Sequence, residues 1–452
     1  MTPIQPTARA LVLASLGLLV ALLPALGVPG GGPLWAAAVG LVVGALAVDL
    51  LACPRSGALR VEVEAPAVLH VDVHAAVSGR RESAEELAVT LRLPSRHRLA
   101  AEVMPELSSH LAPVPSRRLS LPASEGGAGV TVTFPLRSLR RGRAAVEEVW
   151  VAWAGPLGLV RRTAVTHPGT RIAVTPDLGR VRRDALENVT QRDALPGQKL
   201  ERYLGQGTEF HALREWTAGM ERRSVDWKAS ARHTRLLARE VRAERNHQVV
   251  VAVDTGRLMG EPLHGVARLD HAIHAALVLA AVGLRSGDRV GLFAFDDQAR
   301  AYAPPRSGRD TLAALVETAA GLEYSTAETA FTLALTDLAR RLRRRSLVVV
   351  LTDFVDSVTA DLMVDTLERL ARRQLVVFVA FRDPVLGELA TAEPLRRRDL
   401  DRAVVAGALA RDRRRVLARL SRAGVHVVDT EPGAMGPALV DRYLDIKRRE
   451  LI

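Results

Sequence analysis

The chain has 452 residues, of which 48% are hydrophobic, and a formal net charge of +12 at neutral pH. This length predicts two or three domains, and the apolar content is sufficient for buried cores. The single cysteine, Cys53, excludes a disulfide framework and a cysteine-based zinc site. The excess charge is carried mostly by arginine. It is compatible with nucleic acid or an anionic membrane as a partner, but we interpret it as a solvated basic surface.

Two apolar runs open the chain. Residues 10–28 carry no charge and are about as long as one membrane-spanning helix. A second run, residues 34–52, follows a short Pro/Gly connector and contains one charged residue, Asp49. We predict a transmembrane helical hairpin within residues 1–55. A cleaved signal peptide is disfavoured because the second run follows at once and only one arginine precedes the first.

The arginines that flank these runs indicate the orientation of the hairpin. Arg9 precedes the first run, and Arg55 and Arg60 follow the second. Positive residues stay on the inner side, so we expect an anchor in the cytoplasmic membrane, with both ends of the hairpin and the soluble domains in the cytoplasm. Asp49 is either a functional acid within the membrane or, in the interpretation that we favour, an interfacial residue that reaches water.

Between residues 56 and 177, apolar and polar residues alternate in short runs separated by glycine, proline or serine. Several short strands at this spacing predict an antiparallel β-sandwich. The predicted strands are residues 58–66, 68–77, 86–94, 129–136, 144–156 and 170–176. Residues 111–129 are predicted to form either a long loop or a hairpin excursion. No catalytic grouping occurs here, and we interpret the run GPLGL at residues 155–159 as structural.

Residues 178–246 are predicted to be a linker followed by a segment rich in arginine, acid and tryptophan. The residues of this segment that we select as interaction residues are Arg214, Trp216, Arg222, Asp226, Trp227 and Arg232. They form either a folded cap held by ion pairs and Arg–aromatic stacking or a recognition surface, because Trp and Arg are frequent interface anchors. Both interpretations stay open. The interspersed acids argue against nucleic-acid binding.

From residue 247 to residue 452, short apolar strands alternate with helices. This pattern predicts a Rossmann-like α/β domain, with a mostly parallel sheet and helices on both faces. The predicted strands are residues 248–254, 286–296, 346–353, 374–381 and 424–430. The predicted helices are residues 269–285, 309–320, 329–344, 359–373, 401–423 and 434–449. Right-handed crossovers place every carboxyl end of a parallel strand at one edge, where ligand sites lie.

Three motifs carry a resemblance to a known family. They are G-x-E-F-x-x-L-R-E-W at residues 207–216, R-x-V-D-W-K-A-S-A-R at residues 223–232, and a strand ending V-D-T-G-R-L-M at residues 253–259. Together they resemble the bacterial family known as domain-of-unknown-function 58. The resemblance implies a membrane anchor and a von Willebrand A-like C-terminal domain. It also implies a partner ATPase of the MoxR type (AAA+) and a role in the assembly or maturation of other proteins, including membrane or envelope proteins.

In von Willebrand A domains, a divalent cation is held at this edge by a D-x-S-x-S motif, a threonine and a second aspartate. The positions that match here are Asp254, Thr326 and Asp353, and carboxylate and hydroxyl oxygens are the ligands that Mg²⁺ prefers. Gly256 stands at the first serine position and carries no side-chain oxygen. Either the carboxylates hold Mg²⁺ through water, or the site is a relic. In a relic site, which we favour, the carboxylates accept hydrogen bonds from the backbone or from an arginine such as Arg257.

Motifs for catalysis are not apparent. The sequence has no P-loop and no serine-hydrolase elbow, and the triplet at Asp254 follows a predicted parallel strand, unlike that of an aspartic protease. We therefore predict a non-catalytic, membrane-anchored adaptor that works with the ATPase. We expect no cofactor, no nucleic acid and no small-molecule substrate. The rival hypothesis is a divalent-metal-dependent hydrolase or nuclease that uses Asp254 and Asp353.

Overall fold

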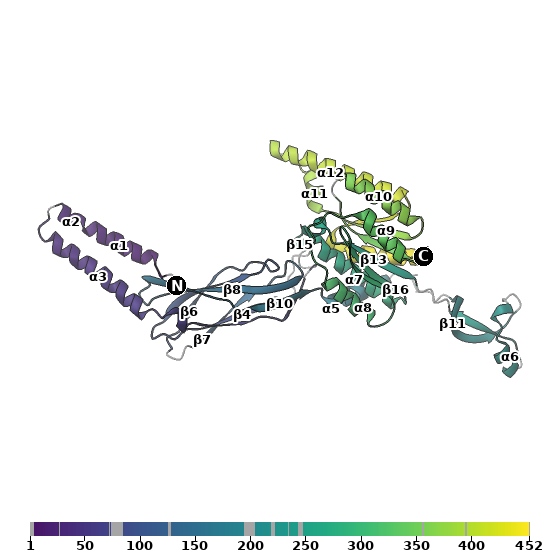
Figure 1. Ribbon diagram of the computed structural model, residues 1–452, viewed down its shortest axis with the longest axis horizontal. Helices are drawn as coiled ribbons and strands as arrows, with labels where there is room; N and C mark the ends of the chain where they lie inside the picture. The colour runs from purple at the N-terminus through teal and green to yellow at the C-terminus, as the bar shows by residue number, and fades with distance from the viewer. Residues whose placement is uncertain are drawn as a thin grey trace. The chain divides into compact units, whose positions relative to one another are not determined.

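The computed structural model describes residues 4–26, 28–71, 73, 85–124, 128–193, 204–217, 222–233, 235–242, 247–354, 357–393 and 396–451. Contacts divide the chain into two compact units (Figure 1). The first unit comprises Met1–Ala75 and Gly79–Thr175, and the second comprises Ala76–Ser78 and Pro176–Ile452. The N-terminal helices thus belong to the same unit as the first group of strands.

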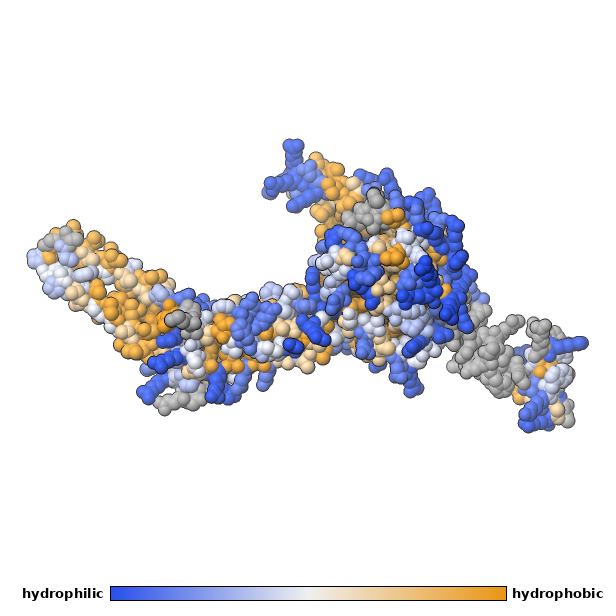
Figure 2. All heavy atoms as spheres, viewed as in Figure 1, coloured by the Kyte–Doolittle hydropathy of each residue, from blue (hydrophilic) through white to orange (hydrophobic). Residues whose placement is uncertain are grey.

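The first unit begins with apolar helices. They are α1 (Ala8–Val20), α2 (Leu22–Ala25) and α3 (Gly31–Ala52), and α1 packs along α3. Apolar side chains cover the outside of α1 and α3 (Figure 2). Among the described residues, one stretch, Gly31–Ala58, is long and apolar enough to cross a membrane, whereas Ala8–Pro24 is shorter. A pair of membrane spans therefore stays a prediction.

The strands of the first unit form two sheets. The larger has the order β1-β9-β8-β10-β3, with β5 pairing β8 and β6 pairing β5, and the smaller has the order β2-β4-β7. The strands are β1 (Ile4–Pro6), β2 (Arg60–Glu64), β3 (Val68–His70), β4 (Glu86–Arg92), β5 (Leu99–Leu107), β6 (Arg117–Leu121), β7 (Gly129–Pro135), β8 (Gly142–Ala154), β9 (Val160–Thr166) and β10 (Thr170–Thr175). The period-two alternation is confirmed on β4, where alternate residues are buried. Of the two alternatives for residues 111–129, the structure has the hairpin excursion, because β6 pairs antiparallel with β5.

Asp49 joins α3 to the turn between β8 and β9. Its side chain is fully buried, and Oδ1 accepts a hydrogen bond from Leu157 N at 2.7 Å. Oδ2 accepts two more, from Leu159 N at 2.7 Å and from Val160 N at 2.8 Å. The prediction that Asp49 reaches water is wrong, because the carboxylate instead accepts hydrogen bonds from two backbone N–H groups of the GPLGL turn and from the first N–H group of β9. A side chain at Gly155 has no room, because a Cβ there would lie 2.4 Å from Asp49 Oδ1.

Further hydrogen bonds surround this contact, which we call the Asp49 joint. Thr7, the N-cap of α1, donates from its hydroxyl to Gly158 O at 2.6 Å, and its backbone N–H donates to Leu159 O at 2.9 Å. Trp153 Nε1, on β8, donates to Pro54 O at 3.2 Å, just after α3. The start of α1 and the end of α3 are thus both fixed to the same turn of the sheet.

The second unit is built on a six-stranded sheet of order β17-β16-β13-β18-β19-β20. The strands are β13 (Gln248–Asp254), β16 (Arg289–Phe295), β17 (Ala299–Arg306), β18 (Leu347–Leu351), β19 (Leu375–Phe381) and β20 (His426–Thr430). All neighbours pair in parallel except β17, which is antiparallel to β16. The order along the chain reverses between β13 and β18. Such a reversal marks the usual place of a ligand site in a doubly wound sheet.

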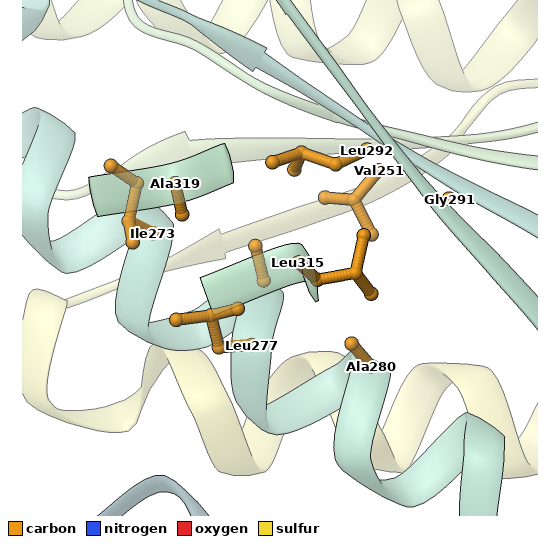
Figure 3. A pocket seen from close by; sticks show the side chains of 9 residues that line it. Val251, Ile273, Leu277, Ala280, Gly291, Leu292, Leu315 and Ala319 are labelled. Carbon is orange, nitrogen blue, oxygen red and sulfur yellow. The ribbon is translucent and has the colours of Figure 1, made fainter. Parts of the chain in front are cut away.

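Helices cover both faces of this sheet, as predicted (Figure 1). Val249, Val251 and Val253 of β13 pack with α7, α8 and α13, whereas Val250 and Ala252 pack with α9, α10 and α12. The helices are α7 (Arg268–Arg285), α8 (Thr311–Ala320), α9 (Phe331–Arg341), α10 (Ser357–Ala371), α11 (Pro384–Thr391), α12 (Arg397–Arg422) and α13 (Met435–Arg448). A small space between α7, α8 and the sheet is lined by carbon atoms alone (Figure 3). It therefore belongs to the core and offers no polar group for chemistry.

Part of the predicted linker is a helix, α5 (Leu178–Asp193). Val181 and Ala185, one helical turn apart, are buried in the core that α7 shares. Asp184 Oδ2 lies 2.8 Å from His274 Nε2 of α7. The linker prediction is wrong for these residues, and residues 194–203 lie outside the described part. His274 thus lies in the contact between α7 and α5.

Candidate functional site

Four aspartates follow the strands at the carboxyl edge of the six-stranded sheet. They are Asp254, Asp296, Asp353 and Asp429. Asp254 and Asp353 follow β13 and β18, so they lie at the reversal point where a doubly wound sheet holds its ligand. We call this group the strand-tip site. Asp296 and Asp429 were not selected from the sequence, although each ends or follows an apolar strand in the same way as the other two.

Asp254 is held by hydroxyl and backbone donors. Its Oδ1 accepts hydrogen bonds from Gly256 N and from Thr329 Oγ1, both at 2.8 Å. Its Oδ2 accepts one from Thr352 Oγ1 at 2.5 Å. The carboxyl group is 1% exposed, and this burial raises its pKa to about 6, although the three hydrogen bonds act in the opposite direction.

The threonine at this edge is Thr329 rather than the predicted Thr326. Thr326 is exposed, whereas Thr329 donates to Asp254. The same contact accounts for the glycine at the first serine position. A Cβ on Gly256 would lie 2.2 Å from Thr329 Oγ1, so a serine at 256 has no room while Thr329 occupies its place. The hydroxyl that the motif lacks at position 256 is therefore supplied from another loop.

Asp353 is paired with two arginines. Arg413 Nη1, from α12, donates to Asp353 Oδ1 at 2.9 Å, and Arg268 Nε lies 3.1 Å from Asp353 Oδ2. The predicted partner, Arg257, instead donates from Nε to Glu328 at 2.8 Å. The relic interpretation thus had the right kind of donor but the wrong residue. No spacing in the sequence connects Arg413 with Asp353, because 60 residues separate them.

Asp296 is also neutralised by an arginine. Its carboxylate is fully buried and accepts hydrogen bonds from Arg300 Nε at 2.7 and 2.6 Å and from Gln298 N at 3.1 Å. Burial alone would raise the pKa of Asp296. The hydrogen bonds from Arg300, Asp297, Ser325 and the backbone of Gln298 together outweigh that effect, and the pKa lies below its usual range. Within the part of the chain that the structure describes, Asp254 differs because its hydrogen bonds come from hydroxyl and backbone groups alone.

The Mg²⁺ site that the resemblance implies does not fit these side chains. Mg²⁺ demands several free oxygen ligands in octahedral geometry. Both oxygens of Asp254 accept protein hydrogen bonds, and both oxygens of Asp353 face guanidinium groups. Among the described residues, no group of three or more His, Cys, Asp or Glu side chains could hold a metal ion.

The segment rich in arginine and tryptophan forms a small module. It comprises β11 (Leu204–Glu215), η2 (Arg222–Ser224), α6 (Trp227–His233) and β12 (Leu237–Arg242), and β11 pairs antiparallel with β12. Asp226 caps α6, because its Oδ1 accepts hydrogen bonds from Lys228 N and Ala229 N at 3.0 Å. Trp216 N donates to Leu236 O at 2.8 Å, and the Trp216 side chain is half-buried. Asp226 and Trp216 thus hold the module together.

The remaining residues of this segment face outward. Trp227 is 69% exposed, and the side chains of Arg214, Arg222 and Arg232 are exposed as well. A tryptophan this open contributes little to the fold of its own module, and a large apolar ring in water is unusual without a partner. The folded-cap interpretation therefore fits Asp226 and Trp216, whereas the recognition interpretation fits Trp227 and the arginines.

A groove lies beside the strand-tip site, between α9 and α10. It has a volume of about 500 Å³, and its lining includes Thr329, Phe331 and two leucines. These leucines, Leu333 and Leu362, are 61% and 59% exposed. Apolar side chains this exposed next to a strand edge are typical of protein contact rather than of an enclosed substrate pocket.

The part of the chain that carries Trp227 and most of the strand-tip site matches a known family model. The match spans residues 212–428, and the family is described as "Protein of unknown function DUF58". These residues are therefore similar to the members of this family. The DUF58 match begins within β11 and ends within β20, so it includes the outward-facing Trp227 and three of the strand-tip aspartates, Asp254, Asp296 and Asp353, and ends one residue before Asp429. The Asp49 joint lies outside it.

Relatives of the DUF58 segment give no established activity. Uncharacterized proteins of Mycobacterium bovis (Mb1516) and Mycobacterium tuberculosis (Rv1480) are each 26% identical over 233 residues, covering 49% of this chain and 71% of theirs.

Solved structures that resemble the chain include the SpRpn10 VWA domain, with 10% identity, a TM-score of 0.28, and coverage of 43% of this chain and 94% of that one. Another is BatB from Bacteroides thetaiotaomicron, with 17% identity, a TM-score of 0.29, and coverage of 45% and 99%. An uncharacterized membrane spanning protein from Vibrio fischeri has 16% identity, a TM-score of 0.18, and coverage of 45% and 99%.

Proposed function

We propose that this protein is a non-catalytic, membrane-anchored adaptor that works with a MoxR-type AAA+ ATPase in the assembly or maturation of other proteins. In this proposal, residues 1–55 form a transmembrane hairpin, residues 56–177 a β-sandwich, and the soluble parts face the cytoplasm. One helical stretch of membrane-spanning length and the apolar cover of α1 and α3 support the anchor. Similarity to the DUF58 family supports the choice of partner through the resemblance given above.

The proposal that the protein is not an enzyme rests on the contacts that the carboxylates of Asp254 and Asp353 make. A hydrolase at this edge needs a carboxylate that is free to activate water or to hold a metal ion. Asp254 instead accepts three hydrogen bonds from its own chain, and Asp353 is clamped by two guanidinium groups. These contacts occupy the oxygens of both side chains, so neither carboxylate is free to activate water or to hold a metal ion.

Trp227 and its neighbouring arginines are the contact surface in this proposal. Exposed tryptophan and arginine are the side chains that most often dominate binding energy at protein interfaces. Lys228 and Arg232 are exposed on the same short helix, and Arg222 is exposed just before it. The exposed side chains here are mainly basic and aromatic, so the partner surface that fits them is acidic, with an apolar recess for the indole ring.

We expect the ATPase to be retained by the full-length protein in a pull-down from gently solubilised membranes, and Trp227→Ala to weaken this retention about 30-fold. That figure corresponds to about 2 kcal/mol, a usual value for an interface anchor. The measurement is quantitative mass spectrometry of the bound fraction, with and without ATP.

Trp150→Ala is the matched control for this experiment. Trp150 is a partly exposed tryptophan of the first unit, and its Nε1 donates to Glu106 at 3.2 Å. Its replacement is expected to leave retention unchanged. Equal retention by Trp227→Ala and wild type would remove Trp227 from the contact surface. Hydrolysis of a substrate by the purified chain, lost in Asp254→Ala, would support the metal-dependent hydrolase instead.

A further inference from the structure

We propose that the helical hairpin formed by α11 and the first half of α12 is a contact surface between two copies of this chain. In the pair, α11 of each copy lies against the start of α12 of the other copy, as a two-fold axis requires. We call the described residues between 384 and 405 the hairpin tip. This inference goes beyond the adaptor function, because it concerns self-association and does not depend on the identity of the ATPase.

The hairpin tip contributes little to the core of its own unit. α12 packs on the core of the sheet through Leu417 and Leu420, which lie in its second half. None of the eight residues of α11 is buried, although α11 packs against α12 (Figure 1). A helix of eight residues is too short to be stable by itself. The chain therefore keeps α11 folded while leaving its surface open to a further contact.

Large apolar side chains are exposed on both helices of the hairpin tip. On α12, Leu400 and Val404 lie one helical turn apart and are 50% and 60% exposed, and Val405 is 59% exposed. On α11, Val385 and Leu389 are also one turn apart and exposed. Figure 2 shows hydrophobic side chains along this hairpin and hydrophilic ones at its free end. Single exposed apolar side chains are ordinary, but five on two packed helices are typical of a protein contact.

The two helices of the hairpin tip carry opposite charges. Residues 384–393 contain two acids, Glu388 and Glu393, and no base, which gives a net charge of −2. Residues 396–402 contain four arginines and two aspartates, which gives a net charge of +2. The charged side chains that are exposed and make no ion pair within the described part of the chain include Glu388, Glu393, Arg397, Arg398 and Arg402. Both charges are thus available to a partner.

This balance of charge favours a second copy as the occupant of the surface. A two-fold pair brings the acidic α11 of each copy to the basic start of α12 of the other, so that opposite charges meet twice. An anionic membrane would attract the arginines but repel the acids, and the charges of −2 and +2 cancel over the tip. The tip has 20 described residues, and a standard interface uses roughly 20–30 residues on each side.

The first test is the monomer–dimer equilibrium of the full-length protein in detergent, measured by sedimentation equilibrium. We expect wild type to dimerise, and Leu400→Asp/Val404→Asp to raise the dissociation constant about 100-fold, because charges would then enter an apolar contact. Leu333→Asp/Leu362→Asp is the matched control. These leucines are 61% and 59% exposed but lie in the groove between α9 and α10, so this variant should dimerise like wild type.

An exchange of charges tests which helices meet. Arg397→Glu/Arg402→Glu reverses the charge at the start of α12, and Glu388→Arg/Glu393→Arg reverses that of α11. Each double variant alone should dimerise about tenfold more weakly than wild type, because like charges then meet twice. An equimolar mixture of the two should form a heterodimer as tightly as wild type dimerises. All four side chains are exposed, so both variants are expected to fold.

Three outcomes overturn the inference. The first is a wild type that stays monomeric, whether or not the hairpin tip then contacts anionic lipid or another protein. The second is an equal loss of dimer in the Leu333→Asp/Leu362→Asp control. The third is a mixture of the charge variants that dimerises no better than either variant alone. If Leu400→Asp/Val404→Asp does not fold, the charge exchange decides. A monomeric wild type leaves the adaptor proposal intact, because that proposal is tested by retention of the ATPase.

Discussion

Replacing Asp49 with alanine is expected to lower the free energy of unfolding of the first unit by at least about 3 kcal/mol. The change leaves three N–H groups, those of Leu157, Leu159 and Val160, buried without an acceptor, and each such loss costs about 1–3 kcal/mol. The measurement is thermal unfolding of the full chain in detergent, followed by tryptophan fluorescence. Trp153 reports on the Asp49 joint because it is buried there and donates to Pro54 O.

Two further variants show whether the joint, and not the loss of a charge, is responsible. Gly155→Ala keeps the carboxylate but places a Cβ 2.4 Å from Asp49 Oδ1, so it should destabilise the same transition. Glu64→Gln removes an exposed acid from β2 and should change little. We also expect faster proteolysis between α3 and β2 in the first two variants. Unchanged stability and proteolysis in Asp49→Ala would show that the joint contributes nothing.

Asp254→Asn is expected to stabilise the second unit at neutral pH by up to about 3 kcal/mol. Burial raises the pKa of Asp254 to about 6, whereas its ordinary value is 3.8. The folded protein therefore binds more protons than the unfolded chain between these two values, and the free energy of unfolding falls as pH rises through this window. An asparagine carries no charge to desolvate. It can accept from Gly256 N and Thr329 and donate to the Thr352 hydroxyl.

The difference between wild type and Asp254→Asn should therefore be small at pH 4 and should grow until about pH 7. Denaturant unfolding of both proteins at each pH measures it. Asp296→Asn is the control of opposite sign. Arg300 holds the pKa of Asp296 below its usual range, so that variant should destabilise the protein at neutral pH. If Asp254→Asn destabilises the second unit at every pH, burial does not destabilise the ionised Asp254 carboxylate, and the prediction is wrong.

The parallel strands of the second unit were predictable because their residues are apolar on both faces. Runs such as the one that forms β13 exclude most other structures, and the observed bounds Gln248–Asp254 match the prediction. The edge strand β17 was missed because it contains Pro304 and Pro305, which oppose a strand in a central position but are tolerated at an edge. In the first unit, the sequence left a loop and a hairpin excursion open for residues 111–129, and only the pairing of β6 with β5 decides between them.

The sequence predicted only those residues of the strand-tip site that lie at the ends of buried strands. Asp254 and Asp353 follow from topology, because each comes at the carboxyl end of a buried strand. Thr329 could not be told from Thr326, since the loop conformation decides which hydroxyl turns inward. Arg413 lies on a long helix with many arginines, and only the packing of α12 on the sheet selects it. Likewise, the acceptor role of Asp49 depends on a turn more than 100 residues away.

The close approach of Gly256 and Thr329 limits which substitutions this chain can accept at position 256. A single codon change to serine at position 256 would bring a new Cβ into the space of the Thr329 hydroxyl. Restoring the serine thus requires a second, compensating change at position 329, and the intermediate with only the first change is overcrowded. Descendants of this chain are therefore expected to keep glycine and threonine together or to exchange both.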